Sequence, residues 1–255
     1  MKTIILAGGL PSTLIEQTEK IPKPMAEIAG RPILWHIMKY YASFGFKDFI
    51  ICGGYKIEVI KEYFMNFYYH QSDITVDLSS NQITIHKQKT EDWKVTVIDT
   101  GLNASISERI AKIWDYLDGE DFWVAYGDCV SNIDLAKMYQ LHQEEKKLAT
   151  LAVARPSGRN QILPITTSGF KAGATVEDVV EDAWINGCNM VFTQAAKEYI
   201  ETHKTIEHVL FDLGNNNQLS TYHHRGFWSS METVRDRDAL NKMWKDDNAP
   251  WKIWE

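Results

Sequence analysis

Cysteine is scarce in this chain, and its few copies are widely spaced. Cys52, Cys129 and Cys188 are the three present, and no CxxC pair occurs. Structural zinc sites and disulfide frameworks need closely spaced or more numerous cysteines, so neither is indicated. Each cysteine is therefore expected to be a small residue of the core.

Long apolar runs and an excess of basic charge are also missing. The apolar start at residues 4–7 is interrupted at once by Gly8, Gly9 and Pro11, so it is too short for a signal peptide or a membrane span. Lys and Arg number 27 against 34 Asp and Glu, which gives a formal net charge of -7. Binding to nucleic-acid or membrane phosphates requires clustered Lys and Arg, which this chain does not concentrate anywhere. A cytoplasmic protein without nucleic-acid or membrane partners is predicted.

What the chain does have is the composition of a compact globular protein. Apolar residues make up 44% of its 255 residues, charged residues 24%, and nine tryptophans are present. This length suits a single α/β domain spanning 1–255. The Trp-rich segment 234–255, with Trp244, Trp251 and Trp254, is expected to pack on the core or on a neighbouring subunit.

Strand patterns alternate with helix patterns along the chain. An α/β fold follows, with a mostly parallel sheet covered by helices on both faces. Ligands bind such sheets at the carboxyl ends of the strands. Strands are predicted at 2–6, 48–52, 72–78, 82–86, 94–99, 122–126, 149–153, 189–192 and 219–224, and helices at 32–44, 57–67, 107–117, 133–143, 194–202 and 234–244.

The segment that follows the first strand carries residues that could contact phosphates. The first strand runs into LAGGLPSTL at 6–14, and IPKPM follows at 21–25. Backbone N–H groups of a glycine turn can approach phosphate oxygens, and a nearby lysine can neutralise them. The pattern is neither GxGxxG nor GxxxxGK[ST], so an ordinary strand-to-helix turn remains the alternative.

The order of several further motifs resembles one family. LAGGL, KPM and GRPILWHIM are similar to the opening of the sugar-1-phosphate nucleotidyltransferases, and ILWHIM in particular resembles the glucose-1-phosphate cytidylyltransferases. The likeness continues through KDFIICGGYK, VTVIDTG, YGD, PSGR, ING, GFWSSMETVRD and APWKIWE, in family order. It implies a Rossmann-like nucleotidyltransferase fold, homo-oligomers, and transfer of CMP from CTP to a sugar 1-phosphate with Mg²⁺ and release of pyrophosphate. Such a reaction serves nucleotide-sugar and polysaccharide biosynthesis.

The resemblance also assigns roles to individual positions. Alternatives remain for four of these positions: a solvated surface lysine for Lys23, a helix N-cap for Asp128, and a turn for Asn186 and Gly187. The implied sites are Lys23 for catalysis, Leu6, Ala7, Gly8, Gly9, Thr13 and Gly127 for the nucleotide, Arg159, Asn186 and Gly187 for the sugar phosphate, and Asp128 and Glu232 for the metal.

Several positions depart from the family pattern. Pro11 and Thr13 replace a glycine and an arginine, and Glu177 stands where a lysine is expected. Glu108 stands where it would repel a nucleotide, and Glu232 replaces an aspartate. Loss of one cation that stabilises a transition state commonly costs about 10²–10³ in rate, and two are lost here.

Two hypotheses therefore remain. The first is a magnesium-dependent cytidylyltransferase in which Lys20, Arg109 or Arg159 replaces the lost cations. The second is a catalytically impaired relative that keeps the fold and serves as a binding or assembly subunit. Retention of Lys23 and Asp128 favours the first, whereas the departures favour the second.

Overall fold

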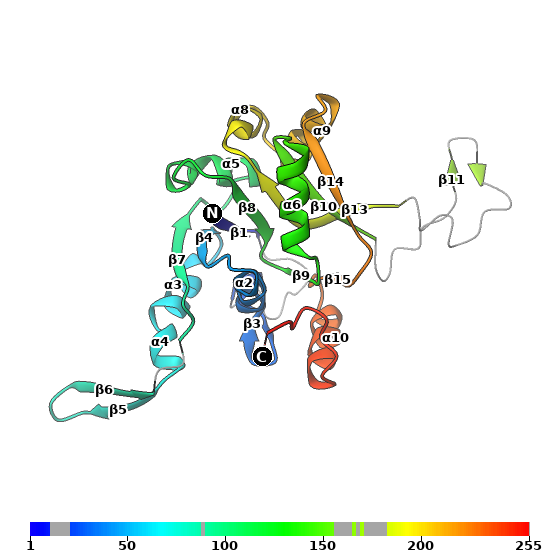
Figure 1. Cartoon of the computed structure of the whole chain (residues 1–255). Coiled ribbons are helices and arrows are strands. Elements are labelled where there is room, and N and C mark those ends of the chain that lie inside the picture. Colours follow the sequence, from blue (N-terminus) through cyan, green and yellow to red (C-terminus); the bar gives the residue numbers. More distant parts are fainter. Residues whose placement is uncertain (11–20, 88–89, 156–164, 167–168, 171–182, 255) are drawn as a thin grey trace.

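A seven-stranded sheet forms the centre of the computed structural model, which describes residues 1–10, 21–87, 90–155, 165–166, 169–170 and 183–254 (Figure 1). All neighbouring strands are parallel except at β13, which is antiparallel to both of its neighbours. The predicted mostly parallel sheet is thereby confirmed. Its order is β14 (Leu219–His224), β10 (Ala149–Ala154), β13 (Ile185–Phe192), β8 (Phe122–Tyr126), β1 (Lys2–Ala7), β4 (Asp48–Gly53) and β7 (Lys94–Asp99).

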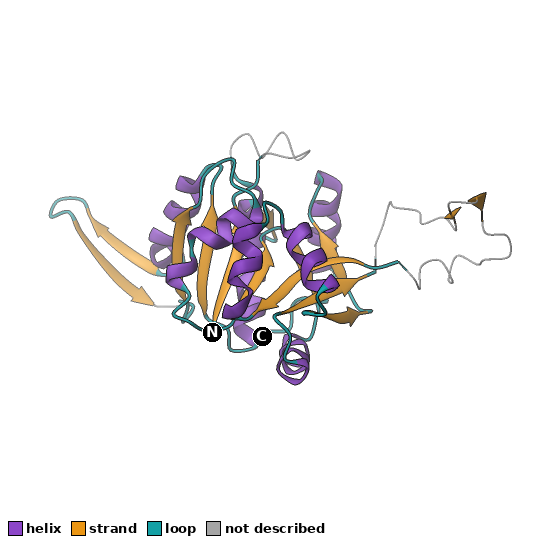
Figure 2. Ribbon diagram, turned by 90° about the horizontal axis from the view of Figure 1, so that it is seen from above, coloured by secondary structure: helices purple, strands orange, loops and turns teal. Residues whose placement is uncertain are grey.

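The central strands are apolar on both faces. In β1, the consecutive residues Ile4 and Ile5 are both 0% exposed, and they belong to two separate apolar clusters. Because side chains alternate along a strand, the two clusters lie on opposite faces of the sheet. Helices accordingly cover both faces (Figure 2).

The helices divide between these two faces. The cluster around Ile5 includes residues of α2 (Ile33–Ser43), α3 (Ile57–Met65), α6 (Leu135–Glu145) and α10 (Val234–Lys245). The cluster around Ile4 includes residues of α5 (Ile106–Lys112), α8 (Lys197–Thr202) and α9 (Ile206–Asn215).

Short elements complete the described part of the chain. The predicted helix at 57–67 ends at Met65, and α4 follows it after Asn66. The predicted helix at 107–117 is α5 followed by the 3-10 turn η2. These short elements are η1 (Lys23–Met25), β2 (Glu27–Ile28), β3 (Arg31–Pro32), α4 (Phe67–His70), η2 (Trp114–Tyr116), β9 (Cys129–Ser131), β11 (Ile165–Thr166), β12 (Gly169–Phe170), η3 (Gln194–Ala196) and β15 (Trp228–Ser230).

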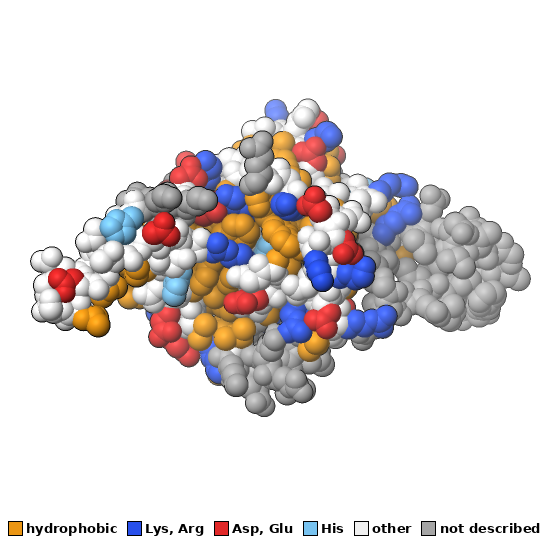
Figure 3. All heavy atoms as spheres, turned by 90° about the horizontal axis from the view of Figure 1, so that it is seen from below, with side chains coloured by type: hydrophobic (Ala, Val, Ile, Leu, Met, Phe, Trp, Pro, Cys, Tyr) orange, Lys and Arg blue, Asp and Glu red, His pale blue; other side chains and the backbone are white. Residues whose placement is uncertain are grey.

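One hairpin projects from the body of the molecule. It consists of β5 (Asp73–Asp77) and β6 (Gln82–Lys87), which pair with each other and stand away from the sheet (Figures 1 and 2). Apolar atoms reach the end of this projection (Figure 3), where Leu78 is 88% exposed. On the same face of the molecule, Lys and Arg are interspersed with Asp and Glu.

None of the helices that the described ranges contain is long and apolar enough to span a membrane.

A buried histidine joins the C-terminal segment to α2. His36 is 0% exposed, and its ring nitrogen Nε2 lies 2.8 Å from the carbonyl oxygen of Ile28. Its Nδ1 accepts a hydrogen bond of 3.4 Å from the indole of Trp251, which is also 0% exposed. This pair of contacts fits a neutral ring that carries its proton on Nε2. Trp251 therefore packs inside this chain.

His36 should make stability depend on pH. Burial lowers the pKa of His36 to about 4, whereas an unfolded histidine titrates near 6.5. The unfolded chain therefore binds a proton first as pH falls through this window, which costs about 3 kcal/mol of stability by pH 4. Urea unfolding between about pH 7 and 4 measures the slope, which should flatten in His36→Gln. An equal slope in both proteins would contradict this role.

Candidate active site

The carboxyl ends of β1 and β8 lie side by side at the centre of the sheet. Leu6 pairs with Tyr126 across these strands, and the backbone N–H of Gly127 donates to the carbonyl of Leu6 at 3.0 Å. A Cβ at Gly127 would lie 2.7 Å from that carbonyl oxygen, which is closer than real side chains come. Glycine is therefore needed at 127 for close packing, and it places Asp128 beside the exit of β1.

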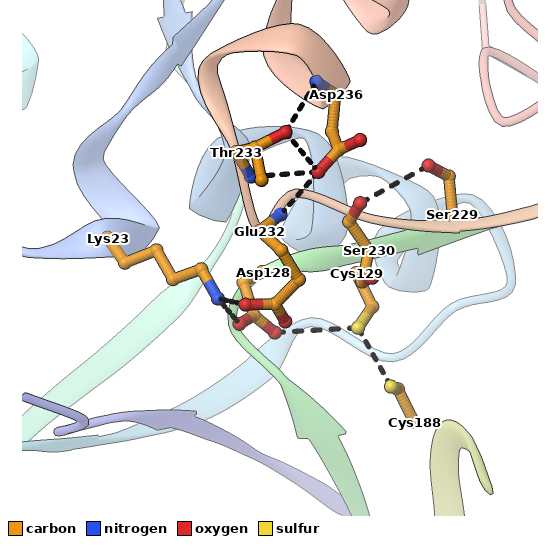
Figure 4. A network of polar contacts seen from close by, with 9 residues as sticks. All are labelled: Lys23, Asp128, Cys129, Cys188, Ser229, Ser230, Glu232, Thr233 and Asp236. Atoms are coloured by element: carbon orange, nitrogen blue, oxygen red, sulfur yellow. Dashed lines mark hydrogen bonds and ion pairs between the residues drawn. The ribbon is translucent and has the colours of Figure 1, made fainter. Parts of the chain in front are cut away.

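Lys23 connects the two predicted metal ligands. Its ammonium nitrogen lies 2.7 Å from Oδ2 of Asp128 and 2.6 Å from Oε2 of Glu232 (Figure 4). The lysine side chain is only 13% exposed, so it is not the solvated surface lysine of the alternative interpretation. Burial lowers the pKa of Lys23, but the two carboxylates outweigh burial and raise it above its usual value. The ammonium is thus firmly charged.

A small strand pair brings Glu232 to this point from more than a hundred residues away. Ser230 of β15 pairs with Cys129 of β9, and the backbone N–H of Met231 donates to the carbonyl of Asp128 at 2.8 Å. Thr233 then caps the start of α10. Glu232 is held between the strand pair and the helix (Figure 4). The alternative role of Asp128 as a helix cap is wrong, because Asp134 caps α6.

Asp128 and Glu232 have the donor chemistry that Mg²⁺ requires. Their oxygens converge on one nitrogen, so they can also converge on one cation. Protein-bound Mg²⁺ commonly uses one or two carboxylates and completes its shell with phosphate oxygens and water. No group of three or more His, Cys, Asp or Glu side chains that could hold a metal occurs in the described part of the chain. Phosphates and water would therefore supply the remaining ligands.

A cavity of about 310 Å³ opens beside this network. Its wall includes Tyr126 of the YGD motif and Ile106 of α5, together with Ala104 and Ser105, which the sequence did not single out. The volume lies at the lower end of the range of about 300–1,000 Å³ that is usual for ligand sites. Of the predicted residues, the cavity is lined by Leu6, Ala7, Gly8, Gly9, Lys23 and Asp128.

Arg109 also lines the cavity, but its guanidinium is bound to the protein. The side chain is buried, and it donates to the carbonyl oxygens of Gly8 at 2.8 Å and Gly101 at 2.8 Å. It also donates to the hydroxyl of Thr100 at 2.6 Å and the carbonyl of Gly53 at 3.1 Å. Burial lowers the pKa of Arg109. Arg109 therefore ties together the loops after β1, β4 and β7 and is not available as a replacement cation.

Gly8 and Gly9 form a matched pair for testing this arrangement. A Cβ at Gly8 would lie 2.1 Å from Nη1 of Arg109, whereas a Cβ at Gly9 would meet no described atom within 4 Å. We expect Gly8→Ala to cost about 1–3 kcal/mol of stability through overpacking. Gly9→Ala should change stability by less than about 0.5 kcal/mol. Urea unfolding of both variants is the measurement, and equal stabilities would contradict the predicted clash.

The predicted sugar residues Asn186 and Gly187 lie on β13 and not in a turn. The side-chain amide of Asn186 donates to the hydroxyl of Tyr126 at 3.4 Å, so Asn186 adjoins the cavity through that tyrosine. A Cβ at Gly187 would lie 2.9 Å from the carbonyl oxygen of Ala152, so Gly187 permits close strand packing. Neither residue lines the cavity itself.

The interpretation of Glu108 as a residue that repels a nucleotide is wrong, and several other predicted residues are not described by the structure. The carboxylate of Glu108 accepts from the backbone N–H of Ser105 at 2.7 Å and so caps α5. Glu108 does not line the cavity, so it is not placed to repel a nucleotide there. Thr13 and Arg159, together with Pro11, Lys20 and Glu177, lie outside the described residues.

Cys129 and Cys188 are neighbours, which their spacing in the sequence did not suggest. Their sulfur atoms lie 2.8 Å apart, and the thiol of Cys129 also donates to Oδ1 of Asp128 at 3.4 Å (Figure 4). The expectation of core cysteines is confirmed for Cys52 and Cys188, which are 0% and 6% exposed, whereas Cys129 is half-buried. No sequence motif signals this pair, because it depends on the meeting of β9 and β13.

A glycine-lined cavity at the carboxyl ends of a mostly parallel sheet is typical of α/β proteins that bind nucleotides. Among solved structures, UDP-glucose pyrophosphorylase from Acinetobacter baumanii has a similar fold, with a TM-score of 0.71 at 13% identity over 95% of this chain and 92% of that one. The inositol-1-phosphate CTP transferase from T. maritima has a TM-score of 0.68 at 14% identity over 100% and 97%. These likenesses confirm the nucleotidyltransferase fold.

The family follows from sequence similarity. The family described as nucleotidyl transferase matches residues 2–161, and the chain belongs to this family. The chain is also 40% identical to a glucose-1-phosphate cytidylyltransferase of Salmonella typhimurium, over 100% of both chains. The resemblance found in the motifs is thereby confirmed.

Proposed function

We propose that this protein transfers a cytidylyl group from CTP to a sugar 1-phosphate or a related phosphorylated acceptor and releases pyrophosphate. The full-length similarity to a glucose-1-phosphate cytidylyltransferase supports this choice within the family. The observation that carries it is the position of Lys23, which lies between Asp128 and Glu232 at the wall of a cavity of about 310 Å³.

The reaction is an in-line displacement at the α-phosphorus of CTP. A phosphate oxygen of the acceptor forms the new P–O bond, the bond to the bridging oxygen breaks, and that oxygen leaves with pyrophosphate. Such a reaction depends on positioning and on neutralisation of phosphate charge. When Mg²⁺ is bound, it supplies part of this neutralisation.

The described residues would bind the nucleotide phosphates, the metal and the acceptor. Lys23 supplies a permanent positive charge for the nucleotide phosphates, and Asp128 and Glu232 hold the metal. Gly8 and Gly9 leave the backbone open to the phosphates at the cavity wall. Asn186 contributes to the acceptor side next to Tyr126. Thr13 and Gly127 belong to the proposed nucleotide site, and Arg159 and Gly187 to the acceptor site.

The ion pairs of Lys23 make nucleotide and metal binding interdependent. In the free protein the ammonium pairs with one oxygen of each carboxylate, and a cation that binds between these two oxygens must displace the ammonium. Nucleotide phosphates offer the ammonium new partners. The affinity for the metal should therefore be far higher in the presence of nucleotide than in its absence.

A second function is a non-catalytic binding or assembly subunit. One structural observation favours it: the cationic side chains that the structure describes at the cavity wall are Lys23 and Arg109, and both are paired within the protein. Arg109 cannot replace the arginine that Thr13 has displaced. Within the described residues, the cavity wall therefore offers a triphosphate little positive charge that is not already paired.

A pyrophosphate-release assay separates the two functions. The full chain is incubated with CTP, Mg²⁺ and a panel of sugar 1-phosphates and other phosphorylated acceptors, with each acceptor omitted in turn as the control. Pyrophosphate that appears only with one acceptor is the expected result. No release with any acceptor, from protein that still binds CTP, would favour the non-catalytic subunit.

We further propose that the protein acts in the cytoplasm as a homo-oligomer with a single domain spanning 1–255. Trp251 is buried within its own chain, so a subunit contact of the C-terminal segment would use its exposed residues, such as Ile253, which is 49% exposed. Sedimentation of the full chain measures the oligomeric state, and a monomer at all concentrations would contradict this part.

A further inference from the structure

Two thiols from distant parts of the chain meet next to the proposed metal site. Cys129 lies on β9 directly after Asp128, and Cys188 lies on β13 directly after Gly187. Their sulfur atoms are 2.8 Å apart (Figure 4), about 0.8 Å more than the length of a disulfide bond. The two sulfur atoms are therefore close enough to react with each other.

The backbone holds Cys188 in place for this contact. Its φ of +64° is in the left-handed region, which residues other than glycine seldom adopt. The backbone N–H of Cys188 donates to Oδ1 of Asn186 at 2.8 Å, and this bond supports the unusual conformation. Such local strain is often found at functional sites. The exposed fraction of Cys188 is 6%, whereas Cys129 is half-buried.

We propose that Cys129 and Cys188 form a reversible disulfide that acts as an oxidation-sensitive modification site. The oxidant is a small-molecule disulfide such as oxidised glutathione. One thiolate of the pair attacks it, which forms a mixed disulfide and releases one small thiol. The second thiolate then attacks the protein sulfur of that mixed disulfide, forms the Cys129–Cys188 bond and releases the second small thiol. The two protons of the protein thiols end on the two released thiols.

Oxidation alters the surroundings of Asp128. The bond removes the thiol proton that Cys129 donates to Oδ1 of Asp128, and it ties β13 to the strand pair that carries Asp128 and Glu232. Because metal and phosphate binding depends on the position of these carboxylates, the oxidised protein binds CTP with Mg²⁺ at least about tenfold more weakly. This consequence rests on the proposed function, whereas formation of the disulfide does not.

Peptide mapping tests the disulfide directly. The full chain is incubated with oxidised glutathione for several hours, because burial of the thiols slows exchange. Digestion and mass spectrometry should show a Cys129–Cys188 crosslink that dithiothreitol removes. Cys52→Ser is the matched control, because Cys52 lies in the core away from the pair, and it should leave the crosslink intact. Absence of the crosslink in the wild-type chain overturns the proposal.

Calorimetry with CTP and Mg²⁺ then tests the consequence. The switch is supported if oxidation weakens CTP binding and dithiothreitol restores the affinity. The same treatment should not change the affinity of Cys188→Ser. Equal affinity of the reduced and the crosslinked protein overturns the switch. If the reduced protein binds no CTP, the proposed function fails and the switch fails with it, whereas the crosslink stands on the peptide map.

Discussion

Replacing Lys23 with methionine is expected to lower the rate of cytidylyl transfer by about 10²–10³, the usual cost of losing one charged group that stabilises a transition state. Lys23 is the cation that lies between the two proposed metal ligands at the cavity wall. Methionine keeps an unbranched apolar side chain, one atom shorter than that of lysine, but removes the charge. Steady-state assays of pyrophosphate release measure the effect.

The same variant should bind a divalent cation more tightly in the absence of nucleotide. Without the ammonium, Asp128 and Glu232 are left as two neighbouring carboxylates without their shared counter-ion. Their mutual repulsion favours a cation between them. Calorimetry with Mn²⁺ alone should therefore show stronger binding to Lys23→Met than to the wild type, whereas binding of CTP with Mg²⁺ becomes weaker.

Lys47 provides the control for both measurements. Its ammonium pairs with Asp92 at 2.6 Å on the surface, and Lys47 does not line the cavity. Lys47→Met should change neither the transfer rate nor the metal affinity. If Lys23→Met behaved like this control, the ion pairs of Lys23 would have no functional importance.

Replacing Arg109 with methionine is expected to destabilise the fold by about 3–5 kcal/mol. The buried guanidinium donates to five acceptors at the end of β4 and in the loops after β1 and β7. Each buried acceptor that is left without a donor costs about 1–3 kcal/mol, and water that enters the cavity recovers part of this cost. Urea unfolding measures the loss, and weaker CTP binding should accompany it because Gly8 loses its anchor.

Arg237→Met is the matched control for Arg109. Arg237 lies on α10 and pairs with its exposed neighbour Asp238 at 2.8 Å. The Arg237 side chain is 20% exposed and that of Asp238 62%, so the pair reaches water and contributes about 0–1 kcal/mol. Because methionine can keep the apolar contacts of the arginine stem, this variant should be nearly as stable as the wild type. A loss of less than about 1 kcal/mol in Arg109→Met would show that its hydrogen bonds are replaced by water.

The strands were the most predictable part of the fold. The predicted ranges 122–126 and 219–224 coincide with β8 and β14, because short apolar or alternating runs have a clear period. The helix α9 at Ile206–Asn215 was not predicted. Its apolar residues Ile206, Val209 and Leu213 are buried at helical spacing, but Gly214 and three asparagines directly after it resemble a loop.

The residues of the site were predictable only where they lie in motifs shared with the family. Lys23, Asp128 and Glu232 were assigned by resemblance, and the structure brings them together. Their direct ion pairs were not predictable, because β9 and β15 must pair before Glu232 reaches Lys23. The role of Arg109 depends on three loops that converge on one guanidinium, and no local pattern encodes such a contact.

Calorimetric titration of the reduced 255-residue chain with CTP in the presence and absence of Mg²⁺ tests most directly whether the Lys23 pocket binds a nucleotide. We predict binding of one CTP per chain with Mg²⁺, and a marked loss of affinity in Lys23→Met but not in Lys47→Met. No heat of binding up to about millimolar CTP, the upper end of usual substrate concentrations, would contradict a nucleotide site at these strand ends.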